Sequence, residues 1–331
     1  MIKVVIDRDI PFIHGLFEPY ARVVEAEGRA ISRRDVADAG VLVVRTRTRC
    51  NASLLEGSAV HTIVTATIGT DHIDTEWCRQ NGIEVFNAAG CNARGVLQWV
   101  AAVLAHTLKI KGVRPQQLTL GVVGAGNVGS LVLHYARLWG FNVLGCDPPR
   151  EEREHCGFIS IDEIFSRADI VTMHVPLDAT TFHLVDKRLL DLLGGRILIN
   201  SSRGEVVDSE ALVSSQAEFA VDVWEHEPDI DPRIVGRALV ATPHIAGYSL
   251  QGKANASARV AEVLAKRCGF PLEGWYPADV GRTRAADIDW DAMCRTIGDY
   301  FDVESESRCL KSHPDEFESM RNNYRYREEY F

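Results

Sequence analysis

Several features are missing from this sequence, and each absence excludes a class of protein. None of its eight cysteines lies in a Cys-x-x-Cys pair, and no zinc-site spacing occurs. No apolar run approaches the roughly 18 residues that a membrane helix needs. The first residues lack the charged-then-apolar layout of a secretory signal, and no repeat is present. We therefore expect reduced thiols, no metal, no membrane association and a cytoplasmic location.

Positive charge is also scarce. The chain holds 36 Lys and Arg against 46 Asp and Glu, a formal net charge of −10. Phosphate contacts need clustered cations, so a nucleic-acid partner is not expected. A small anionic substrate stays possible, because one pocket can be locally positive. The 331 residues are enough for two domains or slightly more.

Short apolar runs alternate with helical patterns along most of the chain, which predicts an α/β fold with parallel sheets covered by helices on both faces. The candidate strands are residues 3–6, 41–44, 62–65, 84–86, 119–123, 142–146, 170–174, 196–200, 219–223 and 239–241. Helices are expected from residue 53 onward and at 75–81, 96–109 and 129–139. The pattern changes near residue 270, and the stretch 317–331 reads as a helix.

A glycine-rich turn follows the strand at 119–123 and opens a helix. Its sequence is Gly124-Ala125-Gly126-Asn127-Val128-Gly129, and Asp147 ends the next strand 21 residues after Gly126. In a dinucleotide fold these glycines permit a tight turn, backbone approach to the pyrophosphate and close helix packing. An acid about 20 residues on binds the ribose hydroxyls and repels a 2′-phosphate. The motif therefore predicts NAD; the alternative is a turn without function plus a helix-capping Asp147.

Three later strands end in chemically active residues. Arg203 follows the strand at 196–200, Glu227 follows the strand at 219–223, and His244 follows the strand at 239–241. Parallel strands meet at one carboxyl edge, so these side chains can converge. Oxidising an alcohol needs a base such as His, a carboxylate to orient it, and a cation for the oxyanion. Each residue alone could be a loop residue, and His174 is a rival histidine that we interpret as structural.

Together these segments resemble the D-isomer specific 2-hydroxyacid dehydrogenases over nearly all of residues 1–270. A narrower resemblance rests on the segments 44–48, 65–72, 89–93, 146–150, 244–253 and 316–329. It implies NAD-dependent oxidation of a phosphorylated acid, 4-phospho-D-erythronate, in vitamin B6 biosynthesis, with Arg203, Glu227 and His244 as catalytic residues. Implied cofactor contacts are the glycine motif with Asn127 and Val128, Asp147, Ser201, Ser202, Asp222 and Gly247. Implied substrate contacts are Arg45, Thr46, Thr67 and Tyr248.

The resemblance also implies an organisation. It predicts two Rossmann-like doubly wound domains: a split substrate domain (1–91 and 255–270) and an inserted NAD domain (92–254), with active sites in the cleft. Residues 271–331 would form a short α+β dimerisation module, so a homodimer is expected. Connections near 177–183 and 213–218 are shorter than the family usually has, and the last module is shortened as well.

Other interpretations stay open at this point. The substrate could be another D-2-hydroxy acid, such as phosphoglycerate, glycerate or lactate, or the protein could sense NAD without turnover. A doubly anionic substrate needs local cations, for which Arg45, Arg47, Arg94 and Lys253 are candidates. Arg321 or Arg325 could reach the phosphate pocket of a neighbouring subunit; the alternative is a solvated helix face.

Overall fold

The computed structural model describes all 331 residues, which form two compact units. The first unit comprises Met1–Asn92 and Leu250–Arg282, and the second comprises Ala93–Ser249 and Thr283–Phe331. Residues 271–331, predicted as a separate module, are thus divided between the two units.

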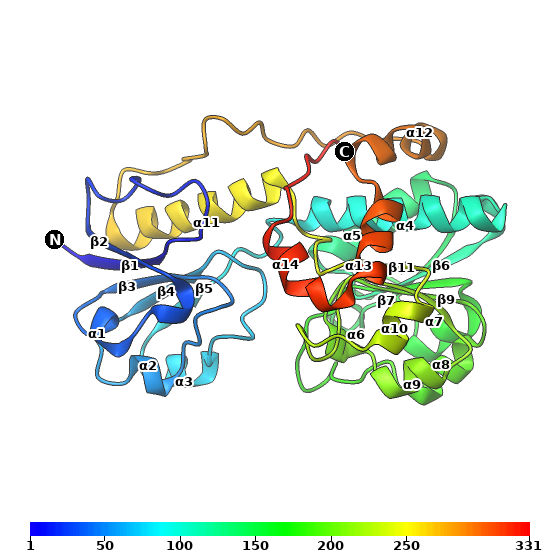
Figure 1. The fold of residues 1–331 in the computed structure, drawn as a ribbon, viewed down its shortest axis with the longest axis horizontal. Helices are drawn as coiled ribbons and strands as arrows, with labels where there is room; N and C mark the ends of the chain where they lie inside the picture. Colours follow the sequence, from blue (N-terminus) through cyan, green and yellow to red (C-terminus); the bar gives the residue numbers. More distant parts are fainter. The chain divides into compact units, whose positions relative to one another are not determined.

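The first unit is built on a parallel five-stranded sheet in the order β2-β1-β3-β4-β5. Helix α11 covers one face, and the short helices α1, α2 and α3 cover the other (Figure 1). Its strands are β1 (Lys3–Asp7), β2 (Arg22–Ala26), β3 (Val41–Val44), β4 (Thr62–Thr65) and β5 (Glu84–Phe86). Its helices are η1 (Gly28–Ala30), α1 (Arg33–Val36), α2 (Ala52–Leu55), α3 (Thr75–Gln80) and α11 (Leu250–Cys268).

The second unit is built on a parallel six-stranded sheet in the order β11-β10-β9-β8-β6-β7. Figure 1 shows α4 and α5 on one side of this sheet and α7 to α10 on the other. The strands are β6 (Thr119–Val123), β7 (Asn142–Cys146), β8 (Ile170–Met173), β9 (Ile197–Asn200), β10 (Glu218–Val221) and β11 (Val240–Ala241). The helices are α4 (Ala93–Lys111), η2 (Pro115–Gln117), α5 (Asn127–Leu138), α6 (Pro148–Glu154), α7 (Ile161–Arg167), α8 (Lys187–Leu193), η3 (Gly204–Val206), α9 (Ser209–Ser214) and α10 (Pro232–Arg237).

The central strands of this sheet are apolar on both faces because both faces are covered. Every residue of β8 and β9 is buried, and side chains from the two strands enter both core clusters. The chain leaves β6 toward one face and β8 toward the other, so the connections diverge at the carboxyl ends of these two neighbouring strands. Ligands of doubly wound sheets bind at such a point. The predicted doubly wound fold is confirmed, with strand ends displaced by one or two residues.

The last residues of the chain are helical and then extended. They contain α12 (Trp290–Tyr300), α13 (Val303–Ser312), η4 (Pro314–Glu316) and α14 (Phe317–Asn322). The expected helix at 317–331 ends at Asn322, and the remaining residues run as a tail (red in Figure 1). This segment, predicted as α+β, holds no strand; its β pairing is a single bridge between Arg327 and Ser249.

One strand, β2, was not predicted from the sequence, whereas the short connections near 177–183 and 213–218 were. Strand β2 is an edge strand with exposed Arg22 and Glu25, so it lacks a clear apolar pattern. In the connection near 213–218, the six-residue helix α9 ends at Ser214 and β10 begins at Glu218, so only residues 215–217 lie between them. Residues 177–183 form turns, in which Asp178 accepts hydrogen bonds from the Thr180 amide and hydroxyl.

None of the eight cysteines forms a disulfide bond in the structure. No group of three or more His, Cys, Asp or Glu side chains is arranged to hold a metal ion. None of the helices combines the length and hydrophobicity needed to cross a membrane.

The tail is held by an aromatic contact, which generates a stability prediction. Phe331 is 2% exposed and packs edge-on against Tyr135 and near Trp139. Phe331→Ala should therefore lower the free energy of unfolding by about 3 kcal/mol, measured by urea denaturation. The control Phe182→Ala removes a ring that is 56% exposed and should cost less than about 0.5 kcal/mol. Equal, small losses in both variants would show that the tail is not docked.

Candidate active site

The glycine-rich turn lies where β6 passes into α5. Gly124 has a φ of +86°, and a Cβ there would lie 2.5 Å from the carbonyl oxygen of His174. A Cβ on Gly129 would lie 1.8 Å from the Gly124 carbonyl oxygen, so the helix packs directly on the turn. A Cβ on Gly126 would meet no atom within 4 Å. The protein's own packing therefore requires glycine at 124 and 129, whereas Gly126 leaves the backbone open to an approaching ligand.

The start of α5 is suited to an anion. Gly126 is its N-cap and supplies no side-chain acceptor, so the first amide groups of the helix are left for another partner. Asn127 and Val128 form the first residues of this helix. The buried hydroxyl of Ser201, beyond the end of β9, has no hydrogen-bond partner. An open turn, an uncapped helix and an orphaned hydroxyl fit the dinucleotide that the sequence predicts.

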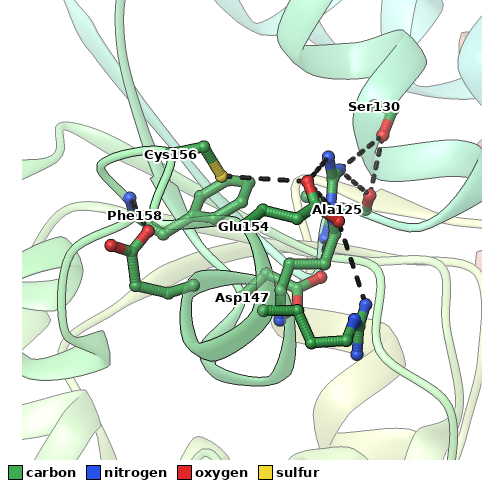
Figure 2. A network of polar contacts seen from close by, with 9 residues as sticks. Ala125, Ser130, Asp147, Glu154, Cys156 and Phe158 are labelled. Atoms are coloured by element: carbon green, nitrogen blue, oxygen red, sulfur yellow. Dashed lines mark hydrogen bonds and ion pairs between the residues drawn. The ribbon is translucent and has the colours of Figure 1, made fainter.

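Asp147 has a structural task in addition to the predicted one. Its carboxylate accepts hydrogen bonds from the Arg150 amide (3.0 Å), as the N-cap of α6, and from the Ala125 amide (2.7 Å). Arg150 lies beside it and donates to the Ala125 carbonyl oxygen at 2.7 Å (Figure 2). Glu154 pairs with the Arg150 guanidinium through both carboxylate oxygens. The Arg150 cation is thus neutralised by Glu154, and the role of Asp147 at the ribose, which would favour NAD over NADP, stays a prediction.

Arg203 leaves the end of β9 on a tightly bound loop. The Asn200 side chain donates to the Arg203 carbonyl oxygen (2.9 Å) and accepts from the amide and hydroxyl of Ser202. Gly204 lets this loop touch the next one, because a Cβ there would lie 1.9 Å from the Trp224 carbonyl carbon. The Ser202 hydroxyl is occupied by its hydrogen bond to Asn200. The Arg203 guanidinium donates a hydrogen bond to the Ser202 carbonyl oxygen.

Glu227 and His244 come together beyond β10 and β11. The His244 Nδ1 lies 2.7 and 3.0 Å from the two carboxylate oxygens of Glu227, and the Trp224 amide donates to the same carboxylate at 3.0 Å. Because Nδ1 faces the acceptor, it carries a hydrogen and Nε2 is left to exchange a proton with a substrate. Burial acts to raise the pKa of Glu227, but His244 and Arg321 lower it, so the carboxylate is ionised at neutral pH.

Asp222 supports the loop that carries His244. It is 1% exposed and accepts from the Thr242 hydroxyl (2.6 Å) and from the amides of Ile245 and Ala246 (2.8 Å each). Burial raises the pKa of Asp222, opposed by the charge of His244 and by these donors. The structure gives this side chain a positioning role; its predicted contact with the cofactor, like that of Gly247 on the same loop, stays a prediction.

The rival histidine, His174, is partly buried. His174 hydrogen-bonds with the Thr172 hydroxyl at 2.9 Å, and burial lowers its pKa to about 3. A histidine that stays neutral over the physiological range is a poor proton carrier. The structural interpretation of His174 is therefore favoured.

The predicted substrate residues of the first unit lie on loops at the carboxyl ends of β3 and β4. Arg45 donates to the Asp9 carbonyl oxygen at 2.7 Å, and Thr46 beside it is exposed. The Thr67 hydroxyl donates to the Gly69 carbonyl oxygen at 3.1 Å and also meets Thr65 at 2.6 Å. Their roles remain predictions. Among the other candidate cations, Arg47 lies 3.9 Å from Asp9.

The fourth substrate candidate, Tyr248, lies in the second unit. It contacts Arg321, a contact that was not predicted from the sequence. The Arg321 Nε donates to its hydroxyl at 3.2 Å, and Arg321 Nη1 lies 3.3 Å from Glu227. Arg321 was predicted to be on a solvated face or in a neighbouring subunit. It lies instead against Glu227 and Tyr248 of its own chain, while Arg325 is exposed. No local pattern indicates a contact between residues 94 positions apart.

The fold and the site define a dehydrogenase. Residues 92–246 match the family model described as "D-isomer specific 2-hydroxyacid dehydrogenase, NAD binding domain". D-lactate dehydrogenase from Aquifex aeolicus, solved with NAD and lactic acid, has the same fold: its TM-score is 0.69 at 23% identity, covering 84% of this chain and 100% of its own. The chain belongs to the D-isomer specific 2-hydroxyacid dehydrogenase family, and its cofactor is NAD.

Within that family, the chain is similar to erythronate-4-phosphate dehydrogenases. The Bacteroides fragilis (strain YCH46) protein is 41% identical, and the match covers 99% of this chain and 97% of that protein. The Pseudomonas syringae pv. syringae protein is 40% identical over 90% of this chain and 84% of its own length.

The Asp147 geometry yields a prediction about cofactor choice. The prediction that Asp147 binds both ribose hydroxyls implies that Asp147→Ala should weaken NAD binding roughly 10- to 100-fold and NADP binding far less. Fluorescence titration with both reduced cofactors measures this.

The matched control is Asp231→Ala, which removes another N-cap, at α10, where Asp231 accepts from the Arg233 amide at 2.8 Å. Both variants should lose about 1 kcal/mol of stability. Unchanged selectivity in Asp147→Ala would remove Asp147 from the ribose site.

Proposed function

We propose that this protein oxidises 4-phospho-D-erythronate to (R)-3-hydroxy-2-oxo-4-phosphooxybutanoate, with NAD as the oxidant, in the biosynthesis of pyridoxal 5′-phosphate. The observation that carries the proposal is the Glu227–His244 pair, joined at 2.7 Å, at the same sheet edge as the dinucleotide turn. The substrate is inferred from 41% identity to the Bacteroides fragilis erythronate-4-phosphate dehydrogenase over 99% of this chain.

The reaction removes a hydride from C2 of the substrate and a proton from its hydroxyl group. NAD, held at the turn 124–129, would supply the hydride acceptor. His244 takes the hydroxyl proton at Nε2, because Nδ1 is engaged by Glu227. The ionised Glu227 then stabilises the imidazolium that forms and holds its ring in place. In the reverse direction, the same nitrogen returns the proton.

Arg203 is assigned to the substrate carboxylate and to the developing oxyanion. A guanidinium presents two parallel N–H groups, which match a carboxylate and favour charge on the neighbouring oxygen. Its loop is fixed by Asn200, so little reorganisation is needed when charge develops. Arg45, Thr46, Thr67 and Tyr248 are proposed as further substrate contacts, and Ser201, Ser202, Asp222 and Gly247 as further cofactor contacts.

Two further assignments follow from the resemblance. We expect a homodimer, which light scattering on the purified protein measures directly. We also expect the protein to act in the cytoplasm, where all eight cysteines stay reduced.

The mechanism predicts a selective effect of His244→Ala. Loss of the proton acceptor should lower turnover roughly 100- to 10,000-fold, while NAD affinity changes little. The measurement is NADH formation with D-erythronate 4-phosphate, together with NAD binding by calorimetry.

His183→Ala is the matched control, since His183 also pairs with a glutamate, Glu225, at 2.8 Å and is not assigned to the reaction. Its turnover should stay close to that of the unchanged protein. Tight NAD binding without turnover on D-erythronate 4-phosphate, 3-phosphoglycerate or D-lactate would instead favour a sensor of NAD.

A further inference from the structure

The C-terminal segment places a cation beside the reactive pair. Arg321, on α14, donates from Nε to the Tyr248 hydroxyl (3.2 Å) and from Nη1 to Glu227 (3.3 Å). Its side chain is 25% exposed, so the guanidinium is largely withdrawn from water but still reachable. Burial acts to lower the pKa of Arg321, and Tyr248 and Glu227 outweigh it, so the group is charged.

The position of Arg321 is fixed by the tail that follows it. Arg327 is 6% exposed and donates to the carbonyl oxygens of Ile245 (2.9 Å), Gly95 (2.8 Å) and Ala246. Two of these carbonyls belong to the loop that carries His244. The Glu329 carboxylate accepts from the Ser249 hydroxyl at 2.6 Å, at the end of the same loop. The residues that follow α14 are thus anchored to the loop that carries His244, and this anchor holds α14 beside that loop.

Arg321 keeps hydrogen-bonding capacity for a further anion. Glu227 already accepts from His244 and from the Trp224 amide, so its single negative charge is matched once His244 is protonated. Asp222, the other carboxyl nearby, is filled by donors of its own loop. Arg203 is assigned to the substrate carboxylate. Arg321 forms an ion pair with Glu227, and its two hydrogen bonds, both longer than 3 Å, use two of its five N–H groups, so part of the guanidinium fork is left to bind an anion.

Arg321 belongs to the C-terminal part of the second unit, residues 283–331. Lactate has one anionic group, whereas a phosphorylated hydroxy acid has two.

We propose that Arg321 is a specificity-determining residue that binds the second anionic group of the substrate, its phosphate, from within the same chain. This inference rests on the proposed function and adds a named receptor for the phosphate. Tyr248 would orient the guanidinium, and the Arg327 anchor would hold α14 in place. A planar fork with free N–H groups suits a phosphate, which accepts two parallel hydrogen bonds.

The test compares a phosphorylated and an unphosphorylated substrate in the full-length protein. In Arg321→Gln, KM for D-erythronate 4-phosphate should rise roughly 10- to 100-fold, while KM for D-erythronate stays within a few-fold of its original value. Arg321→Lys should recover part of the loss, because it keeps the charge without the fork. Arg325→Gln is the matched control, since it removes the same charge from an exposed position of the same segment and should leave both KM values unchanged.

Three results would overturn the inference: unchanged KM values in Arg321→Gln, an equal loss on both substrates, or the same loss in Arg325→Gln. An equal loss would mean that Arg321 acts only through Glu227. The proposed function is judged separately, by turnover of D-erythronate 4-phosphate in the unchanged protein. If that turnover is absent, calorimetry can measure the binding of D-erythronate 4-phosphate and D-erythronate in the presence of NADH. The inference about Arg321 then requires that Arg321→Gln weakens binding of the phosphorylated acid roughly 10- to 100-fold and that of the other acid by no more than a few-fold.

Discussion

The site depends on how one loop, Thr242 to Ser249, is held. Asp222 binds it from the β10 side through the Thr242 hydroxyl and two amides, and Arg327 binds its carbonyl oxygens from the tail. Two buried charged groups of opposite sign thus satisfy a stretch without regular secondary structure. Leaving either group unpaired would cost several kcal/mol, so the loop has one favourable arrangement. In that arrangement His244 meets Glu227, and the remaining chemistry follows from this contact.

The same arrangement links substrate chemistry to the end of the chain. In a minimal dehydrogenase, the catalytic His and Glu need only the sheet edge that presents them. Here α14 and the tail bring a second cation, Arg321, to that edge, 94 residues from its partner Glu227 in the sequence. With a formal net charge of −10, the protein needs local cations for an anionic substrate, and the proposed phosphate contact of Arg321 would supply one. That proposal would give the C-terminal segment a part in the site.

Local patterns predicted the parts of this structure that depend on local physics. The strand, glycine turn and helix from Thr119 to Leu138 were predictable because each residue type answers a backbone requirement, as at Gly124 and Gly129. The meeting of Glu227 and His244 followed from the rule that parallel strands end at one edge. Strand β2 was not predictable, since its edge position removes the apolar pattern. The helix expected to Phe331 ends at Asn322, because Arg327 and Phe331 reach their partners from an extended chain; such long-range contacts leave no periodic signal.

The central claim is that Glu227 fixes the proton on Nδ1 of His244 and leaves Nε2 to exchange a proton with the substrate. Nitrogen NMR of the protein labelled with ¹⁵N-histidine tests this directly, with the His244 signals assigned by their loss in His244→Gln. The account predicts that neutral His244 is protonated at Nδ1 and unprotonated at Nε2, and that Glu227→Gln disturbs this preference while Glu225→Gln does not. A neutral His244 with its proton on Nε2 would contradict the account, because that nitrogen could not accept the substrate proton.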